Sequence, residues 1–176
     1  MGFVSSTLIF AACLLAISTI FAFIPPRHPD LWKRLPRHRN SGGIMGLICL
    51  MWCASYALPM FEETSPQIRL FITILVPVIA VLAYFFLSFI FARALGGLVV
   101  LGVTHLLGVA FVANPWGRAL YAALCYLLAA GGIAIIISPW LLRDMLEKAA
   151  YARLQRYLVP AILTVSALTM VAIAVI

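Results

Sequence analysis

The chain of 176 residues is 65% hydrophobic and 10% charged, whereas soluble domains contain about 45–50% apolar and about 25% charged residues. A water-soluble fold of this length cannot bury so much apolar surface, so we expect lipid to be its solvent. The formal net charge of +7 is carried by short segments between apolar runs, where positive charge sets membrane orientation and attracts anionic lipid, so we predict no nucleic-acid partner.

Six apolar runs along the chain are long enough to cross a membrane. The first, residues 3–24, has no positive leading segment and no clear cleavage signal, so we interpret it as a retained span rather than a signal peptide. Pro25-Pro26 ends it, because proline lacks the N–H that continues a helix. The other predicted spans are residues 41–61, 68–92, 94–113, 119–137 and 157–176.

The third and fourth runs are not separated by a polar loop. As one helix they would exceed 40 residues, which is too long for a bilayer core of about 30 Å. Arg93 and Gly96-Gly97 interrupt the apolar sequence. We therefore predict the turn of a helical hairpin at these residues.

Residues 141–156, between the fifth and sixth runs, are predicted to form an amphipathic helix. At 100° per residue, Leu142 and Leu146 fall on one side, while the charged residues, including the spaced pairs Arg143–Glu147 and Asp144–Lys148, fall on the other. We expect this helix to lie in the membrane interface, with docking against a partner subunit as the alternative.

Lysine and arginine are distributed unevenly across the six predicted spans. Ten of the twelve fall on one side, and only Arg69 and Arg118 fall on the other. Because positive loops resist translocation, the richer side is predicted to be cytoplasmic and both termini to lie outside the cytoplasm. The sequence thus predicts a single all-α domain over residues 1–176, a polytopic transmembrane helical bundle of six spans in a plasma (inner) membrane.

His105 is the one ionisable residue deep in a predicted span, beside Thr104. Two interpretations remain open: a ligand or proton-sensitive site, or a neutral histidine bonded to a neighbouring helix. The predicted spans contain no internal acid, which argues against proton-coupled carriers and metal-dependent enzymes. Cys49 and Cys53, four residues apart, are interpreted as packing residues, with a soft-metal or redox pair as the alternative.

Small residues recur at helical spacing in two spans, and such faces let helices approach closely. The spacing does not distinguish packing within the chain from association with another chain. The predicted packing residues are Gly97, Thr104 and Gly108 in the fourth span, and Ala119, Ala123, Ala130 and Ala134 in the fifth.

The segment 25–40 holds the densest cluster of positive charge, and we predict it to be a cytoplasmic loop. Guanidinium groups favour phosphate, so anionic lipid headgroups are predicted ligands. Docking of an acidic partner, or a role in membrane orientation alone, are the alternatives. The residues concerned are Arg27, Lys33, Arg34, Arg37 and Arg39.

No G-x-S-x-G, Walker A, H-E-x-x-H or C-x-x-C motif occurs, and no cofactor or catalytic residue is predicted. Charge-free spans, small-residue faces and basic loops favour a non-catalytic accessory or structural subunit of a larger membrane complex. The alternative is a small transporter or channel with a weakly polar path near Thr104 and His105. A third hypothesis is a lipid-modifying enzyme using His28, Asp30 and His38.

Overall fold

The structure, a computed structural model, describes residues 2–23, 39–60, 66–86, 90–151 and 153–175. Within these ranges it contains seven helices and no strand, which confirms the predicted all-α class. The helices are α1 (Phe3–Phe23), α3 (Arg39–Met60), α4 (Pro66–Phe86), α5 (Ile90–Ala113), α6 (Arg118–Ile137), α7 (Pro139–Tyr151) and α8 (Arg153–Val175).

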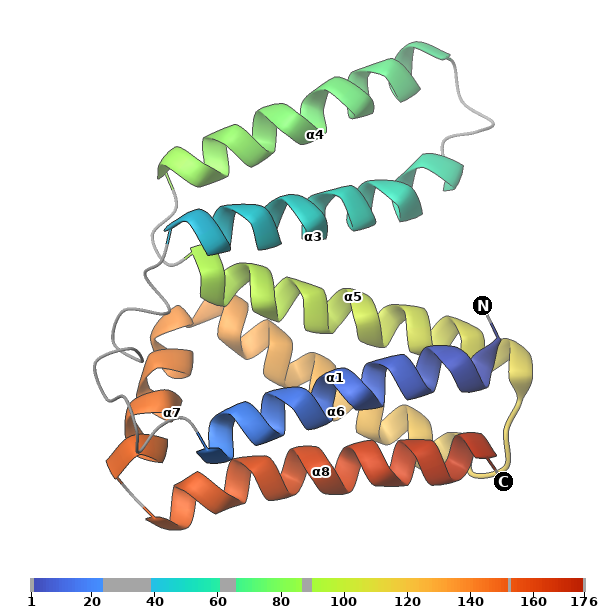
Figure 1. Cartoon of the computed structure of the whole chain (residues 1–176). Coiled ribbons are helices and arrows are strands. Elements are labelled where there is room, and N and C mark those ends of the chain that lie inside the picture. The colour runs from blue at the N-terminus through green and yellow to red at the C-terminus, as the bar shows by residue number, and fades with distance from the viewer. Residues whose placement is uncertain (1, 24–38, 61–65, 87–89, 152, 176) are drawn as a thin grey trace.

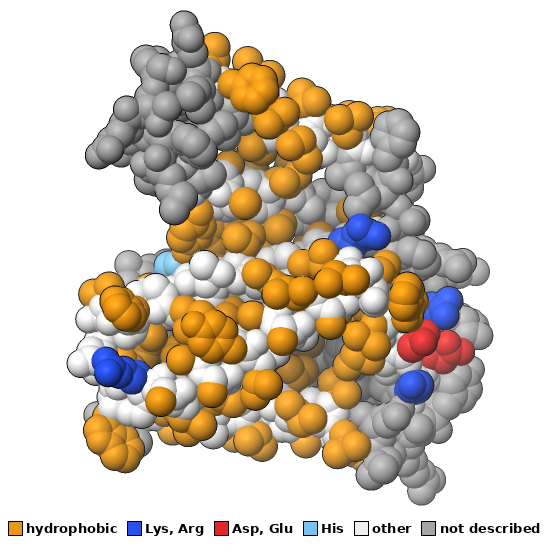
Figure 2. All heavy atoms as spheres, turned by 180° about the vertical axis from the view of Figure 1, so that it is seen from behind, with side chains coloured by type: hydrophobic (Ala, Val, Ile, Leu, Met, Phe, Trp, Pro, Cys, Tyr) orange, Lys and Arg blue, Asp and Glu red, His pale blue; other side chains and the backbone are white. Residues whose placement is uncertain are grey.

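Four of these helices are long and apolar enough to cross a membrane, judged on the described residues. They are α1, α5, α6 and the Tyr157–Val175 part of α8, and α3 adds a shorter apolar stretch over Ser41–Tyr56. Hydrophobic side chains cover the middle of the described surface, and charged ones gather toward its two ends (Figure 2). The chain is therefore an all-helical protein suited to a membrane.

The helices form a bundle with one peripheral hairpin (Figure 1). The closest pairs are α1 with α8 and α5 with α6, and α3 packs between α5 and the outermost helix, α4. The start of α1, the end of α8 and the turn from α5 to α6 lie at one end of the bundle, and α7 lies at the other. We call the first of these the α5–α6 end.

The largest apolar cluster lies where α5, α6 and α8 meet. Val103, Leu106, Tyr121, Cys125 and Met170 are almost fully buried there. A second cluster joins Ala11 and Leu14 of α1 to Ala167 of α8. Lipid supplies no hydrophobic drive between helices, so these contacts stabilise the bundle through close packing.

Glycines mark the closest helix crossings. A Cβ at Gly96 of α5 would lie 2.6 Å from the carbonyl oxygen of Gly132 in α6, and one at Gly132 would lie 3.0 Å from the oxygen of Gly96. A Cβ at Gly42 of α3 would lie 2.7 Å from the backbone nitrogen of Phe91. Only glycine permits such backbone contact without moving a helix.

The turn between α4 and α5 is not where the sequence predicts it. Helix α4 ends at Phe86 and α5 begins at Ile90, so Arg93, Gly96 and Gly97 lie inside α5. The glycine pair costs helix propensity, but Gly96 gains the contact with α6 that a side chain would prevent. The predicted hairpin turn at these residues is therefore wrong.

The predicted amphipathic segment 141–156 is also divided differently. Helix α7 covers Pro139–Tyr151, and residues 153–156 already belong to α8. Leu142 and Leu146 are buried against Ala92 and Ile135, so the apolar side of α7 packs on α5 and α6. Within the described part of the chain, Arg143 pairs with its neighbour Asp144 at 3.1 Å and not with Glu147.

Candidate functional site

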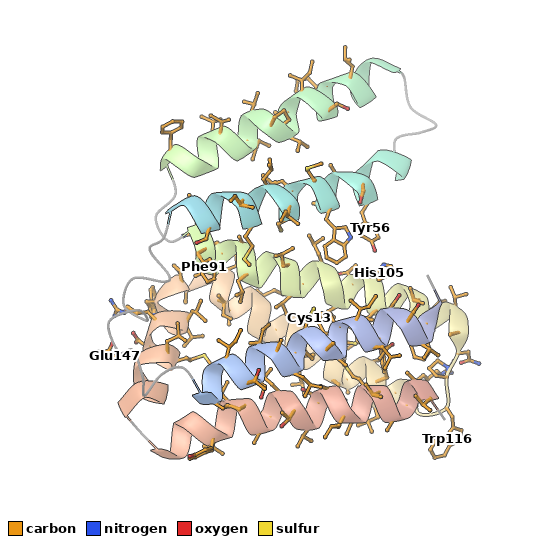
Figure 3. The ribbon with its side chains drawn as sticks, in the orientation of Figure 1. Cys13, Tyr56, Phe91, His105, Trp116 and Glu147 are labelled. Atoms are coloured by element: carbon orange, nitrogen blue, oxygen red, sulfur yellow. The ribbon has the colours of Figure 1, made fainter. Side chains whose placement is uncertain are left out.

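His105 joins three helices near the α5–α6 end (Figure 3). From α5, its Nδ1 lies 2.5 Å from the hydroxyl of Tyr56 in α3. Its Nε2 lies 3.4 Å from the Oγ of Ser6 in α1. Both ring nitrogens therefore have partners on neighbouring helices.

Two aromatic rings of α3 flank the imidazole. The ring centroids of Trp52 and Tyr56 lie 6.4 Å and 6.3 Å from that of His105. Residues four apart share one face of a helix, so both rings reach α5 from the same side of α3. The imidazole is thus flanked by two aromatic rings in addition to its hydrogen-bond partners.

A second polar contact continues from this one through α1. Thr7, next to Ser6, has its Oγ1 3.0 Å from the hydroxyl of Tyr121 in α6, and both side chains are fully buried. Thr7 also donates to the carbonyl of Phe3 at 2.9 Å. A hydroxyl has one proton, so Tyr121 is the donor to Thr7. We call Ser6, Thr7, Tyr56, His105 and Tyr121 the polar layer.

The polar layer runs across the bundle and not along it. Its residues lie within about two turns of helix termini that all point to the α5–α6 end. Thr104, the neighbouring predicted site residue, donates to the carbonyl of Val100 in its own helix. The layer can hold α1, α3, α5 and α6 in register, and it offers hydrogen-bonding groups at one membrane depth.

The predicted packing residues of α5 have different surroundings. A Cβ at Gly97 would lie 2.9 Å from the Sγ of Cys49 in α3, so this residue packs within the chain. Thr104 and Gly108 are exposed, and nothing lies within 4 Å of a Cβ built at Gly108. The structure therefore brings only the first of the three against a neighbouring helix.

The alanines of α6 that were predicted to pack are mostly not buried within the chain. Ala119, Ala123 and Ala130 are exposed, and Ala134 is half-buried. The close crossings instead involve glycines that are not among the predicted packing residues: Gly42, Gly96, Gly102 and Gly132. The Gly-Gly pairs at 42–43, 96–97 and 131–132 are a sequence signal for three of them, and Gly102 belongs to no such pair.

The remaining predicted sites are partly outside the described residues. Arg27, Lys33, Arg34 and Arg37 lie outside them, as do His28, Asp30 and His38, while Arg39 is the first residue of α3. All four cysteines are free thiols. In the described part of the chain, no three His, Cys, Asp or Glu residues come together in a way that could hold a metal ion.

No protein-family model matches this chain, and neither curated proteins nor solved structures yield a match.

Proposed function

We propose that the protein crosses a plasma (inner) membrane six times, with both termini outside the cytoplasm and α7 in the cytoplasmic interface. The charges of the described helices support this orientation. Arg93 lies in the first turn of α5, next to Ala92, which packs on α7. Helix α7 itself carries Arg143 and Lys148, whereas Arg118 begins α6 at the opposite, α5–α6 end. Positive residues are thus concentrated at the α7 end, as expected of a cytoplasmic side.

We propose further that it is a non-catalytic accessory or structural subunit of a larger membrane complex. The alanine face of α6, formed by Ala119, Ala123, Ala130 and Ala134, is the observation that carries this. Within the chain the closest helix contacts are made at glycines, whereas the alanine face of α6 remains largely exposed. Small residues at helical spacing favour close helix association in lipid, so a transmembrane helix of another subunit is the proposed occupant.

The basic segment 25–40 supplies the second contact of this proposal. Its arginines and lysine favour anionic lipid headgroups, and they also suit an acidic surface on a partner subunit. Such contacts would orient the protein beside its partner. The α6 face would then provide the tight packing within the bilayer.

The geometry favours this function over a transporter or channel. A transport path needs polar groups spaced along the membrane normal, whereas the polar layer lies at one depth and both His105 nitrogens are engaged within the chain. A lipid-modifying enzyme needs clustered acids or histidines at an interface. The residues of that hypothesis, His28, Asp30 and His38, lie outside the described part.

Site-specific photo-crosslinking in native membranes tests the proposal. A photoreactive amino acid at Ala123 or Ala130 is expected to give a discrete adduct with one other membrane protein. The matched control positions are Ile162 and Leu168 of α8, which are 65% and 61% exposed but present large side chains. These positions are expected to give lipid adducts only.

The adduct from α6 is then identified by mass spectrometry, and Ala123→Leu is expected to abolish it without unfolding the chain. Lipid adducts alone from every position would contradict the proposed subunit function. Adducts only between copies of this chain would show a homo-oligomer and also contradict it.

A further inference from the structure

Arg93 is a cation whose Nε has no hydrogen-bond acceptor. In the part of the chain that the structure describes, this Nε is the one buried side-chain nitrogen or oxygen without a partner. The residue as a whole is half-buried, so the side chain is partly accessible from outside the bundle. A charged group that is partly removed from water needs an anion or an acceptor nearby, because its desolvation otherwise costs free energy. The described helices do not supply one.

The position of Arg93 lies between two helix contacts. Arg93 stands one turn before Gly96 and Gly97 in α5, and residues three or four apart share one face of a helix. Gly96 meets the backbone of α6, and Gly97 meets Cys49 of α3. Position 93 is therefore flanked by α3 and α6, near the α7 end of the bundle (Figure 1). In Figure 2, a basic side chain is at the surface where the α3–α4 hairpin meets the rest of the bundle.

Two helix N-termini meet beside Arg93. Helix α3 begins at Arg39 and α5 begins at Ile90. A Cβ at Gly42, in the first turn of α3, would lie 2.7 Å from the backbone nitrogen of Phe91, in the first turn of α5. The first N–H groups of a helix have no acceptor within it, and the positive end of the helix dipole lies there. Both helix ends therefore add positive potential to that of the guanidinium.

The acidic side chains that the structure describes do not neutralise this potential. They are Asp144 and Glu147, both on α7. Asp144 pairs with Arg143 at 3.1 Å. Figure 3 shows Glu147 on the outer side of α7, away from Phe91 at the contact between α3 and α5. The surroundings of Arg93 thus carry net positive charge, which favours an anion as the missing partner.

We propose that Arg93 and the adjoining starts of α3 and α5 bind the phosphate of an anionic phospholipid. Helix α5 is long and apolar enough to cross a membrane, so its first turn, which contains Arg93, lies at the depth of the lipid headgroups. Guanidinium N–H groups match the spacing of phosphate oxygens. Because the surroundings are positive, a headgroup without its own cation, such as that of phosphatidylglycerol, is favoured over phosphatidylcholine. Only the placement of this lipid in the cytoplasmic leaflet rests on the proposed function.

Native mass spectrometry tests this on the full chain, released from nanodiscs that contain equal amounts of phosphatidylglycerol and phosphatidylcholine. Arg93→Gln removes the charge, so the affinity for one phosphatidylglycerol is expected to fall about tenfold. Arg93→Lys keeps the charge but loses the planar donor group, so the affinity should fall less. Arg143→Gln is the matched control, because it makes the same change in net charge at a residue that is exposed and already paired with Asp144.

Thermal unfolding in detergent gives a second measurement. Added phosphatidylglycerol is expected to raise the melting temperature of the unaltered chain and of Arg143→Gln, but not that of Arg93→Gln. If Arg93→Gln does not fold, Arg93→Lys against Arg143→Lys makes the same comparison.

Equal loss of phosphatidylglycerol in Arg93→Gln and Arg143→Gln would overturn the proposal, because it would reflect net charge alone. Unchanged lipid binding in Arg93→Gln would also overturn it. If that variant instead lost the α6 photo-adduct, Arg93 would be assigned to an acidic group on a partner subunit. The photo-crosslinking at Ala123 and Ala130 is a separate measurement, so failure of the proposed subunit function leaves this lipid site to stand or fall on its own result.

Discussion

Thr7 and Tyr121 form the buried half of the polar layer. They lie 114 positions apart in sequence, and their hydroxyls are 3.0 Å apart with no exposure. Because Thr7 donates to Phe3, Tyr121 has Thr7 as its acceptor. The pair therefore links α1 to α6 through one hydrogen bond inside the apolar core.

Thr7→Val keeps the shape of the side chain and removes that acceptor. We expect it to lower the free energy of unfolding by about 1 kcal/mol. A hydrogen bond between membrane helices contributes about 0.6 kcal/mol on average, and the buried hydroxyl of Tyr121 that is left without an acceptor adds a further cost. Unfolding in mixed micelles of mild detergent and dodecyl sulfate measures the change. Thr104→Val is the control, because that hydroxyl is exposed and bonds its own helix.

Tyr121→Phe in the Thr7→Val background leaves no unpaired hydroxyl. The double variant should therefore lose less stability than the two single variants together. Strict additivity would show that the two hydroxyls do not interact in the folded protein.

Helix α5 is the element on which the bundle is built, because it contacts α1, α3, α6 and α7. Its glycines differ in the contacts that they make with neighbouring helices. Gly96 meets the backbone of α6 and Gly102 meets the ring of Phe10 in α1, but Gly108 meets nothing. Glycine is thus required for packing at position 96, whereas position 108, about three turns later in α5, has space for a side chain.

Gly96→Ala places a methyl group 2.6 Å from the carbonyl oxygen of Gly132 and 2.8 Å from a side-chain carbon of Ile136. Backbone cannot yield as a side chain does, so α5 and α6 must separate, at a cost of about 1–3 kcal/mol. The same mixed-micelle unfolding measures it. Gly108→Ala is the matched control and should be neutral or stabilise by up to about 1 kcal/mol. Equal destabilisation by both variants would mean that the α5–α6 crossing is not as close as described.

The described residues form six helices of 20 or more residues and the shorter α7, and most of their positive charge lies at the α7 end. This arrangement agrees with the proposed orientation, in which the α7 end is cytoplasmic and the α5–α6 end is outside. The polar layer then belongs to the outer half of the membrane.

Reporter fusions measure this orientation directly. Alkaline phosphatase is active only outside the cytoplasm, so we expect activity when it is fused after Val175 and none when it is fused after Tyr151. A fluorescent protein that matures only in the cytoplasm should give the complementary result at both sites. Phosphatase activity at Tyr151 would reverse the orientation, and activity at both sites would contradict an uninterrupted span over α8.

The fold class and the positions of the long helices follow from sequence alone, because an uncharged run of about 20 residues has one stable form in lipid. Helix boundaries are harder to predict where the sequence between two helices has no glycine or proline. None lies between Phe86 and Ile90, whereas the Gly96-Gly97 pair is typical of a turn but lies inside α5. The glycines there serve packing, which depends on a second helix.

The sequence alone is therefore enough to predict an all-helical chain whose long apolar helices suit a membrane, and to single out His105 within one of them. Only the tertiary structure decided which small residues close the bundle and which are left exposed, and only it joined His105 to Ser6 and Tyr56. The reason is physical: apolarity and periodicity are properties of one helix, but close approach and hydrogen bonding are properties of a pair.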